Sequence, residues 1–227
     1  MELLAPDELV MLPLWYVAFL LAVTCHEAAH AWVAWLGGDP TAYVGGQVTL
    51  NPLPHIQREP FGTILAPLLS YILVGWTMGW ASAPYDPYWE DRYPRRAALM
   101  ALAGPLANLV LAALGFAVLK TGLVVGWWVQ AAGQPDQMVL TETTPSWAAG
   151  VAVFASIILL LNCVLFVFNL FPVPPLDGAS VVAGLGEWGR TYRDTLRSSF
   201  SLIGLVVAWA LFPRVFGPFY GFVVALL

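Results

Sequence analysis

Long apolar runs separated by short polar stretches extend through the whole chain. A transmembrane helix needs about 20 consecutive apolar residues, and several of these runs reach or approach that length. The apolar runs are Leu12–Leu36, Phe61–Ala83, Ala97–Leu119, a shorter tail at Thr121–Ala132, Trp147–Phe171 and Phe200–Leu227. The pattern predicts an all-α polytopic membrane protein, a bundle of roughly four to six transmembrane helices.

Two segments between the first and third apolar runs depart from this pattern. Tyr43–Ile56 is predicted to be extended, because its apolar residues are punctuated by Gly-Gly and Asn-Pro turn signals. Phe61–Ala83 is interrupted by Pro67, Gly75 and Gly79, so it is predicted to dip into the membrane and return. We therefore expect the bundle to contain a re-entrant or extended, β-like segment near the active site.

The composition supports a membrane protein and excludes other classes. Hydrophobic residues make up 59% of the 227 residues and charged residues only 10%, against about 25% charged in soluble domains. The nine Lys and Arg form no basic stripe, which excludes a nucleic-acid-binding protein. The polar loops are too short for a folded domain, so residues 1–227 are expected to form one integral membrane domain. Its core motifs span residues 12–183, and residues 199–227 form a hydrophobic hairpin or helix.

Arginines predict the orientation of the bundle, because loops rich in Lys and Arg stay on the cytoplasmic side. Asp91–Arg96 and Glu187–Arg197 hold most of the arginines and are expected inside, whereas Gln134–Ser146 has none and is expected outside. The third apolar run, Ala97–Leu119, then crosses the membrane outward, and the fourth, Trp147–Phe171, crosses back. The alternative to a re-entrant Phe61–Ala83 is a full crossing there, compensated by another at Thr121–Ala132.

The first apolar run contains the sequence His26-Glu27-Ala28-Ala29-His30. Two histidines four residues apart on a helix share one face, one turn apart, so both imidazoles can bind one zinc ion. The glutamate between them can accept a proton from a zinc-bound water. An ionisable side chain in hydrocarbon costs about 2.5–3.5 kcal/mol by insertion scales, so three of them close together indicate a function.

A catalytic zinc site usually has three protein ligands, and the third can be His, Glu or Asp. Asp177 is the outstanding candidate, since it follows the proline-rich break Pro172–Pro175 and precedes Gly178. Irregular backbone at membrane depth is tolerated only where it packs in protein or lines a cavity. Because all three candidate ligands lie near the C-terminal ends of their runs, the first and fourth runs are predicted to point the same way.

Three ordered motifs in this chain resemble those of the site-2 proteases, the M50-like intramembrane zinc metalloproteases. The motifs are His26–His30, Gly104-Pro105-Leu106-Ala107-Asn108 and Asn169-Leu170-Phe171-Pro172-Val173-Pro174-Pro175-Leu176-Asp177-Gly178. The resemblance spans roughly Leu12 to Ala183 and is to the compact subgroup that lacks PDZ and CBS domains.

The resemblance implies one zinc ion per chain, bound by His26, His30 and Asp177, with Glu27 as the catalytic general base. It implies hydrolysis of peptide bonds within or next to the transmembrane segments of membrane protein substrates, as in regulated intramembrane proteolysis. It also implies a multi-pass protein of the cell membrane, with the active site set into the membrane from the cytoplasmic side. The expected partners are a transmembrane protein or peptide substrate and the lipid bilayer. The oligomeric state stays open.

Three further polar residues are candidates for contact with the substrate backbone or the developing oxyanion. Asn108 and Asn169 are amides in otherwise apolar runs, where hydrogen bonding between helices is the alternative role. His55 is the remaining histidine of the chain, and it could cap the site, bind substrate or be purely structural. Glu90, in contrast, is predicted to be a solvated loop charge.

An intact substrate helix hides its carbonyl groups in hydrogen bonds. We therefore expect the substrate to unwind and pair as a strand with Tyr43–Leu50, by β-augmentation. Two alternatives to a protease are a non-enzymatic metal-binding transporter or sensor, and a pseudoprotease that binds helices without cutting them. A pure metal-binding site needs no general base, so the role of Glu27 separates the first alternative from a protease.

Overall fold

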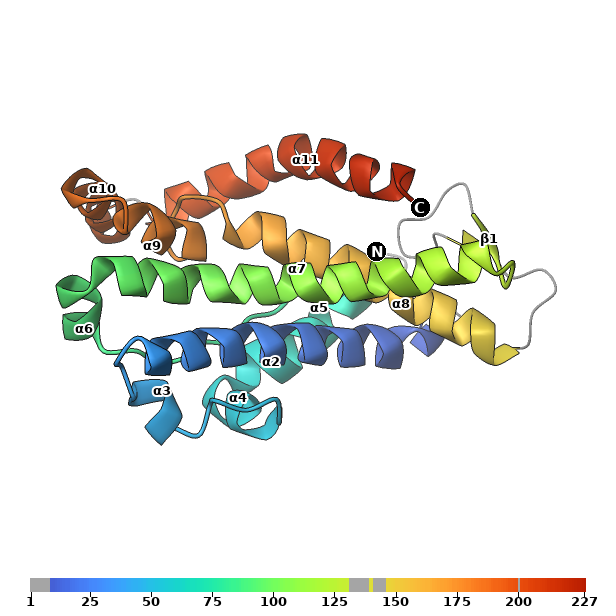
Figure 1. Ribbon diagram of the computed structural model, residues 1–227, viewed down its shortest axis with the longest axis horizontal. Helices are drawn as coiled ribbons and strands as arrows, with labels where there is room; N and C mark the ends of the chain where they lie inside the picture. Colours follow the sequence, from blue (N-terminus) through green and yellow to red (C-terminus); the bar gives the residue numbers. More distant parts are fainter. Residues whose placement is uncertain (1–8, 131–138, 141–145, 200) are drawn as a thin grey trace.

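The fold is an elongated bundle of helices, and the computed structural model describes residues 9–130, 139–140, 146–199 and 201–227 (Figure 1). The elements are α2 (Leu12–Leu36), α3 (Thr41–Val44), α4 (Leu53–Arg58), the π-helical turn η1 (Phe61–Leu65), α5 (Ala66–Val74), α6 (Pro87–Arg92), α7 (Pro94–Val124), β1 (Val129–Gln130), β2 (Val139–Leu140), α8 (Ser146–Asn169), α9 (Asp177–Ala183), α10 (Glu187–Ser199) and α11 (Ser201–Ala225). Within these residues four helices, α2, α7, α8 and α11, are long and apolar enough to cross a membrane. The chain is therefore an all-α polytopic membrane protein, as the sequence predicts.

Helices α2, α7 and α8 form the packed centre of the bundle. Helix α7 contacts α2, α8 and α9, and small residues such as Ala18 and Ala22 are fully buried where helices approach closely. Helix α11 packs on α8 through aromatic rings, with Phe168 lying 4.9 Å from Trp209 and 5.5 Å from Phe212 between ring centroids. Most of the remaining surface of α11 is apolar and exposed, as expected of a helix that faces lipid.

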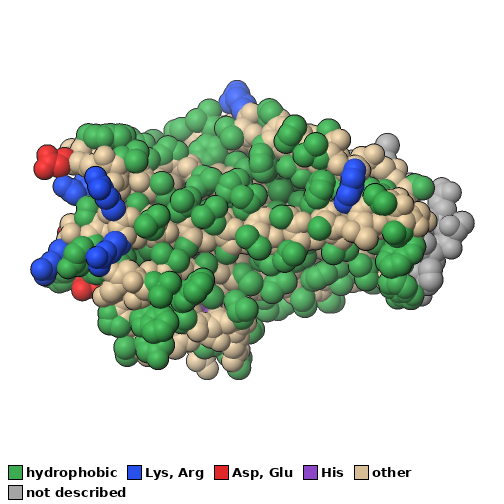
Figure 2. All heavy atoms as spheres, viewed as in Figure 1, with side chains coloured by type: hydrophobic (Ala, Val, Ile, Leu, Met, Phe, Trp, Pro, Cys, Tyr) green, Lys and Arg blue, Asp and Glu red, His purple; other side chains and the backbone are tan. Residues whose placement is uncertain are grey.

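The helices alternate in direction along the bundle. Helices α2 and α8 end at the same end of the molecule, where α6, α9 and α10 also lie, whereas α7 and α11 run the opposite way (Figure 1). This arrangement confirms that the first and fourth apolar runs point in the same direction. Figure 2 shows most Lys and Arg side chains at this end, next to a predominantly apolar body.

The second apolar run dips into the bundle and returns, as predicted. It forms the short helical segment Phe61–Val74, which ends at Gly75 with a left-handed backbone (φ 80°) that glycine adopts without strain. The chain then returns without helix or strand. The N–H of Trp80 donates to the carbonyl oxygen of Gly62 at 3.1 Å, so the returning segment is back beside the start of η1.

The prediction that Tyr43–Ile56 is extended is wrong, because this segment holds the short helices α3 and α4. Asp39 Oδ1 accepts from the N–H of Thr41 (2.9 Å), and Asn51 Oδ1 accepts from the N–H of Leu53 (3.1 Å). Such hydrogen bonds from a side chain to the backbone two residues on are typical of turns, and together with prolines at the helix starts they favour helical turns over strands. The extended segment near the site is instead the return of the re-entrant run, residues 77–86.

Two connections complete the fold. Asp39, which is 1% exposed, also accepts from the N–H of Asp86 through Oδ2 at 2.8 Å, so its carboxylate joins the end of α2 to the start of α6. At the other end of the bundle, β1 and β2 pair as an antiparallel ladder of two residues each. Most of the predicted polar loop Gln134–Ser146 lies outside the described residues. The C-terminal apolar stretch forms one helix, α11, rather than a hairpin.

Candidate metal centre

His26 and His30 lie one turn apart on the same face of α2. Both are buried, and their Nε2 atoms lie 2.9 Å apart with the rings edge to face. This geometry follows from the helical repeat, which stacks residues i and i+4. The spacing in the sequence is thus sufficient to bring the two imidazoles together.

The other nitrogen of each ring is held by an acceptor on α7. His26 Nδ1 donates to Asn108 Oδ1 at 2.6 Å, and His30 Nδ1 donates to the carbonyl oxygen of Met100 at 2.7 Å. Because both partners are acceptors, both Nδ1 atoms carry the hydrogen and both Nε2 atoms present a lone pair. Metal-binding histidines are oriented in the same way by acceptors at their second nitrogen.

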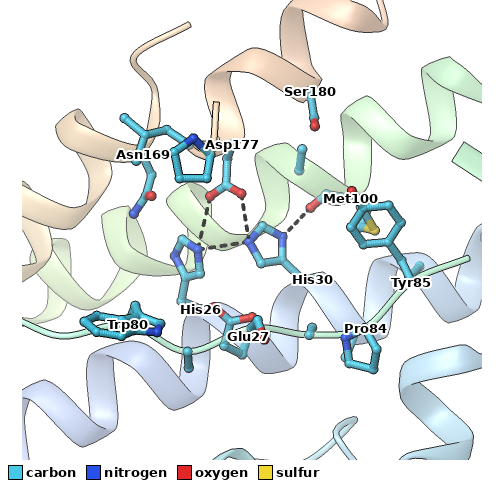
Figure 3. A pocket seen from close by; sticks show the side chains of 18 residues that line it. His26, Glu27, His30, Trp80, Pro84, Tyr85, Met100, Asn169, Asp177 and Ser180 are labelled. Atoms are coloured by element: carbon cyan, nitrogen blue, oxygen red, sulfur yellow. Dashed lines mark hydrogen bonds and ion pairs between the residues drawn. The ribbon is translucent and has the colours of Figure 1, made fainter. Parts of the chain in front are cut away.

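Asp177 reaches the same point from the opposite wall. Its Oδ2 lies 3.1 Å from His26 Nε2 and its Oδ1 lies 3.4 Å from His30 Nε2 (Figure 3). It follows the irregular segment between α8 and α9 and is the first residue of α9. A β-carbon at Gly178 would collide with the carbonyl oxygens of Leu170 and Phe171, so a glycine is required for this segment to fold back tightly.

The donor set of His26, His30 and Asp177 fits zinc. Two nitrogen lone pairs and a carboxylate face one another, and they would repel unless a cation lay among them. Asp177 Oδ2 is buried and has no hydrogen-bond donor among the described residues. Two imidazoles and one carboxylate are a ligand combination typical of zinc sites that keep a position for substrate.

Gly104 allows α7 to pass directly against the imidazoles. A β-carbon at this position would collide with the Nε2 atoms of both His26 and His30. Gly104 begins the second of the three sequence motifs, and the structure shows that the pair of candidate ligands packs directly against it.

A cavity of about 420 Å³ opens beside the candidate ligands. Glu27 lines it, and the donor atoms of His26, Glu27 and His30 lie within 4.8 Å of one another. The extended return segment forms another wall, and Figure 3 shows its labelled residues, Trp80 and Tyr85 among them, along the side of the cavity that Glu27 faces.

The three substrate-contact candidates lie in different places. Asn169 lines the cavity, while its Nδ2 donates to the carbonyl oxygen of Leu165 at 3.0 Å. Asn108 is fully buried behind His26 and does not line the cavity. His55 is 1% exposed on α4, where its Nε2 bonds to the carbonyl oxygen of Thr49 at 3.1 Å, away from the cavity.

Two polar contacts near the site were missed in the sequence. Asn162, fully buried on α8, accepts from Asn108 Nδ2 at 2.8 Å. The sequence feature that could have indicated Asn162 is an amide in an apolar run, two helical turns before Asn169. The prediction that Glu90 is solvated is wrong, because Glu90 is 3% exposed and lies 2.5 Å from Arg193, which is 6% exposed. This ion pair joins α6 to α10, and no local pattern in the sequence pairs the two residues.

Comparisons with known proteins agree with this geometry. The family model of peptidase family M50 matches residues 14–211. The chain is 35% identical over 200 residues to a Bacillus subtilis protein named "Putative zinc metalloprotease YwhC", covering 88% of this chain and 81% of that protein. It is 32% identical over 205 residues to a Mycobacterium tuberculosis protein named "Putative zinc metalloprotease Rip2", covering 90% and 69%. No solved structure matches the chain. The family match and these relatives show that the chain belongs to peptidase family M50, the site-2 protease family of membrane zinc metallopeptidases.

Proposed function

We propose that the protein is an intramembrane zinc metalloprotease that cleaves peptide bonds within or next to the transmembrane segments of membrane proteins. The observation that carries the proposal is the convergence of His26, His30 and Asp177 on one point beside Glu27. His26 and His30 lie in the second half of α2, and Asp177 is the first residue of α9, which follows α8; both α2 and α8 are long enough to span a membrane. Family membership supports the reaction class.

Glu27 is the residue that moves the proton. When bound, zinc supplies Lewis acidity that polarises the scissile carbonyl and acidifies a water molecule. The Glu27 carboxylate, buried beside the ligands and lining the cavity, accepts the proton of the attacking water. It then delivers the proton to the leaving amine. Asn169, at the cavity wall, has an amide oxygen and a second amide hydrogen with which to hold the substrate backbone.

The return segment of the re-entrant run provides a place for an unwound substrate. Ala81, Ser82 and Ala83 line the cavity, and their backbone groups form no hydrogen bond with any described residue. Ser82 Oγ donates to Glu59 Oε1 at 2.7 Å, which anchors the segment from behind. An extended peptide beside these free N–H and C=O groups would gain main-chain hydrogen bonds in place of those of its helix. This segment takes the place that the sequence prediction assigned to Tyr43–Leu50.

The charge distribution favours a cytoplasmic opening of the site in the cell membrane. The end of the bundle that holds the ends of α2 and α8 also holds most of the Lys and Arg (Figures 1 and 2). Segments rich in these residues stay on the cytoplasmic side. We therefore place Asp177 and the cavity towards the cytoplasmic face.

Zinc content and cleavage together test the proposal. Purified wild-type protein is expected to hold about one zinc per chain by elemental analysis, and Asp177→Ala much less. Glu27→Gln is the matched variant, because it retains the ligands and removes the general base. It should keep its zinc yet cleave a membrane-embedded reporter substrate at least about 100-fold more slowly. A well-folded wild type without zinc, or a Glu27→Gln variant that cleaves normally, would overturn the proposal.

A further inference from the structure

A chain of buried amides runs behind His26 and spans three helices. The Nδ2 of Asn162 on α8 donates to the carbonyl oxygen of Ile158 at 2.9 Å. The Oδ1 of Asn162 accepts from Asn108 Nδ2 at 2.8 Å, and Asn108 Oδ1 accepts from His26 Nδ1 at 2.6 Å. Both asparagines are fully buried, so bulk solvent does not reach their amides.

The donor-to-acceptor direction of these hydrogen bonds is fixed at the end farthest from His26. The carbonyl oxygen of Ile158 can only accept, so Asn162 turns its NH₂ group towards it and its oxygen towards Asn108. Asn108 must then turn its own NH₂ group towards Asn162. That group also lies 3.3 Å from the carbonyl oxygen of Ala22. The oxygen of Asn108 is left facing His26, which has to carry its hydrogen on Nδ1.

Rotation of the Asn108 amide by half a turn would reverse this outcome. Its NH₂ group would donate to His26 Nδ1, and the hydrogen would move to Nε2, where it would cover the lone pair that a metal needs. In the observed structure that rotation would set the oxygen of Asn108 against the oxygens of both Asn162 and Ala22. Unpaired buried acceptors facing one another are costly, so Asn162 opposes the rotation, together with the more distant carbonyl oxygen of Ala22.

His26 and His30 differ in the kind of acceptor that holds Nδ1. His30 Nδ1 donates to the backbone carbonyl oxygen of Met100 on α7, and a carbonyl oxygen can only accept a hydrogen bond. His26 donates to a side-chain amide, which has both a donor and an acceptor face. Only His26 therefore depends on a further residue to select its tautomer.

We propose that Asn162 is a positioning residue of the metal centre, which fixes the tautomer of His26 by orienting Asn108. The proposal rests on the zinc centre proposed above. Residues behind metal ligands typically change metal affinity by about 10- to 100-fold when replaced. Among the described residues Asn162 does not line the cavity and its hydrogen bonds go to Asn108 and Ile158, so its effect on His26 runs through Asn108.

The test compares three variants of the full-length protein in lipid nanodiscs. Asn162→Leu removes the acceptor and keeps the volume, and Asn162→Asp keeps an acceptor oxygen towards Asn108. The matched control is Ser156→Ala, which removes a fully buried polar group of α8 that bonds only to the carbonyl oxygen of Ala152 in its own helix. Zinc affinity is measured by competition with a chromogenic chelator. The ¹⁵N shifts of labelled histidine in zinc-free protein report the tautomer of His26.

Asn162→Leu is expected to bind zinc about tenfold more weakly and to populate the Nε2–H form of His26, whereas the Asp and Ser156 variants stay within about threefold of wild type. Wild-type affinity and an unchanged tautomer in Asn162→Leu would overturn the proposal. If Asn162→Leu shows no thermal unfolding transition, it has not folded. Asn162→Ala, which also removes the amide, then replaces it in the comparison. The tautomer measurement needs no zinc, so it decides this proposal even where a zinc-free wild type has refuted the proposed function.

Discussion

The histidines and the aspartate reach the same cavity from parts of the molecule that are held in different ways. His26 and His30 lie within α2, where the neighbouring α7 and α8 support them through Asn108, Asn162 and the backbone. Asp177 lies on α9 at the end of the bundle, after a segment without helix or strand. The helical half is thus fixed by packing and buried hydrogen bonds, and the aspartate half by the packing of α9 on α7 and α10, a tight backbone fold and one buried ion pair.

The ion pair of Glu90 and Arg193 is the main polar support of the aspartate half. Arg193 on α10 lies 2.5 Å from Glu90 on α6, and Ser180 on α9 donates weakly to the same carboxylate at 3.5 Å. Helix α10 also packs against α9. The comparison teaches that charged side chains on α6 and α10 support the aspartate half, whereas the helical half depends on packing and on neutral hydrogen bonds inside the bundle.

Gly104→Ala should have the largest effect on zinc binding, through the helical half of the site. The added β-carbon would collide with both Nε2 atoms, so zinc affinity is expected to fall by at least about 100-fold, the upper end of what supporting residues cost. The control is Gly150→Ala on α8, where the β-carbon meets no atom within 4 Å and should raise helix stability by about 1 kcal/mol. Zinc titration and thermal unfolding compare the two variants. Normal zinc affinity in Gly104→Ala would refute the close approach of α7.

Arg193→Met should weaken the aspartate half by a smaller factor. It leaves the Glu90 carboxylate buried without its cation, which typically costs about 3–5 kcal/mol of stability. We expect a lower melting temperature and about tenfold weaker zinc binding, because α9 loses a support rather than a ligand. The double variant Glu90→Leu with Arg193→Met removes both charges and should recover most of the lost stability. A double variant no more stable than Arg193→Met would argue that the pair does not act as a unit.

Ser180→Ala should have the smallest effect on this half. Its hydrogen bond to Glu90 is long, and a typical hydrogen bond contributes about 0.5–1.5 kcal/mol, so a loss at the lower end of that range is expected. Zinc binding should stay within about twofold of wild type. A loss as large as that of Arg193→Met would mean that Ser180, rather than the ion pair, holds α9 in place.

The parts of the site that the sequence predicts are those whose geometry is local. The pairing of His26 with His30 follows from the helical repeat, and the break that carries Asp177 follows from its prolines and glycine. The hydrogen bond between Asn108 and Asn162 joins residues 54 positions apart, and the ion pair of Glu90 and Arg193 joins residues 103 positions apart. No spacing rule connects partners that meet only after the helices have packed.

The misplaced extended segment has a different cause. Apolar residues and turn signals in Tyr43–Ile56 suggested an extended segment, but apolar side chains on the surface of a membrane protein can lie on any face of a segment. Val44 is 81% exposed and Leu50 is 70% exposed. Apolar residues therefore do not indicate a strand there, and the turns at Asp39 and Asn51 decide the local structure.

The carboxylate of Asp39 holds together the two ends of the excursion between α2 and α6. Residues 39 and 86 are 47 positions apart, and one side chain joins them. Between these ends the excursion is held at a second place, because Tyr71 is buried against Trp15 of α2. The excursion also forms one wall of the cavity, so a substitution in that wall changes the shape of the cavity while the candidate metal ligands on the helices stay the same.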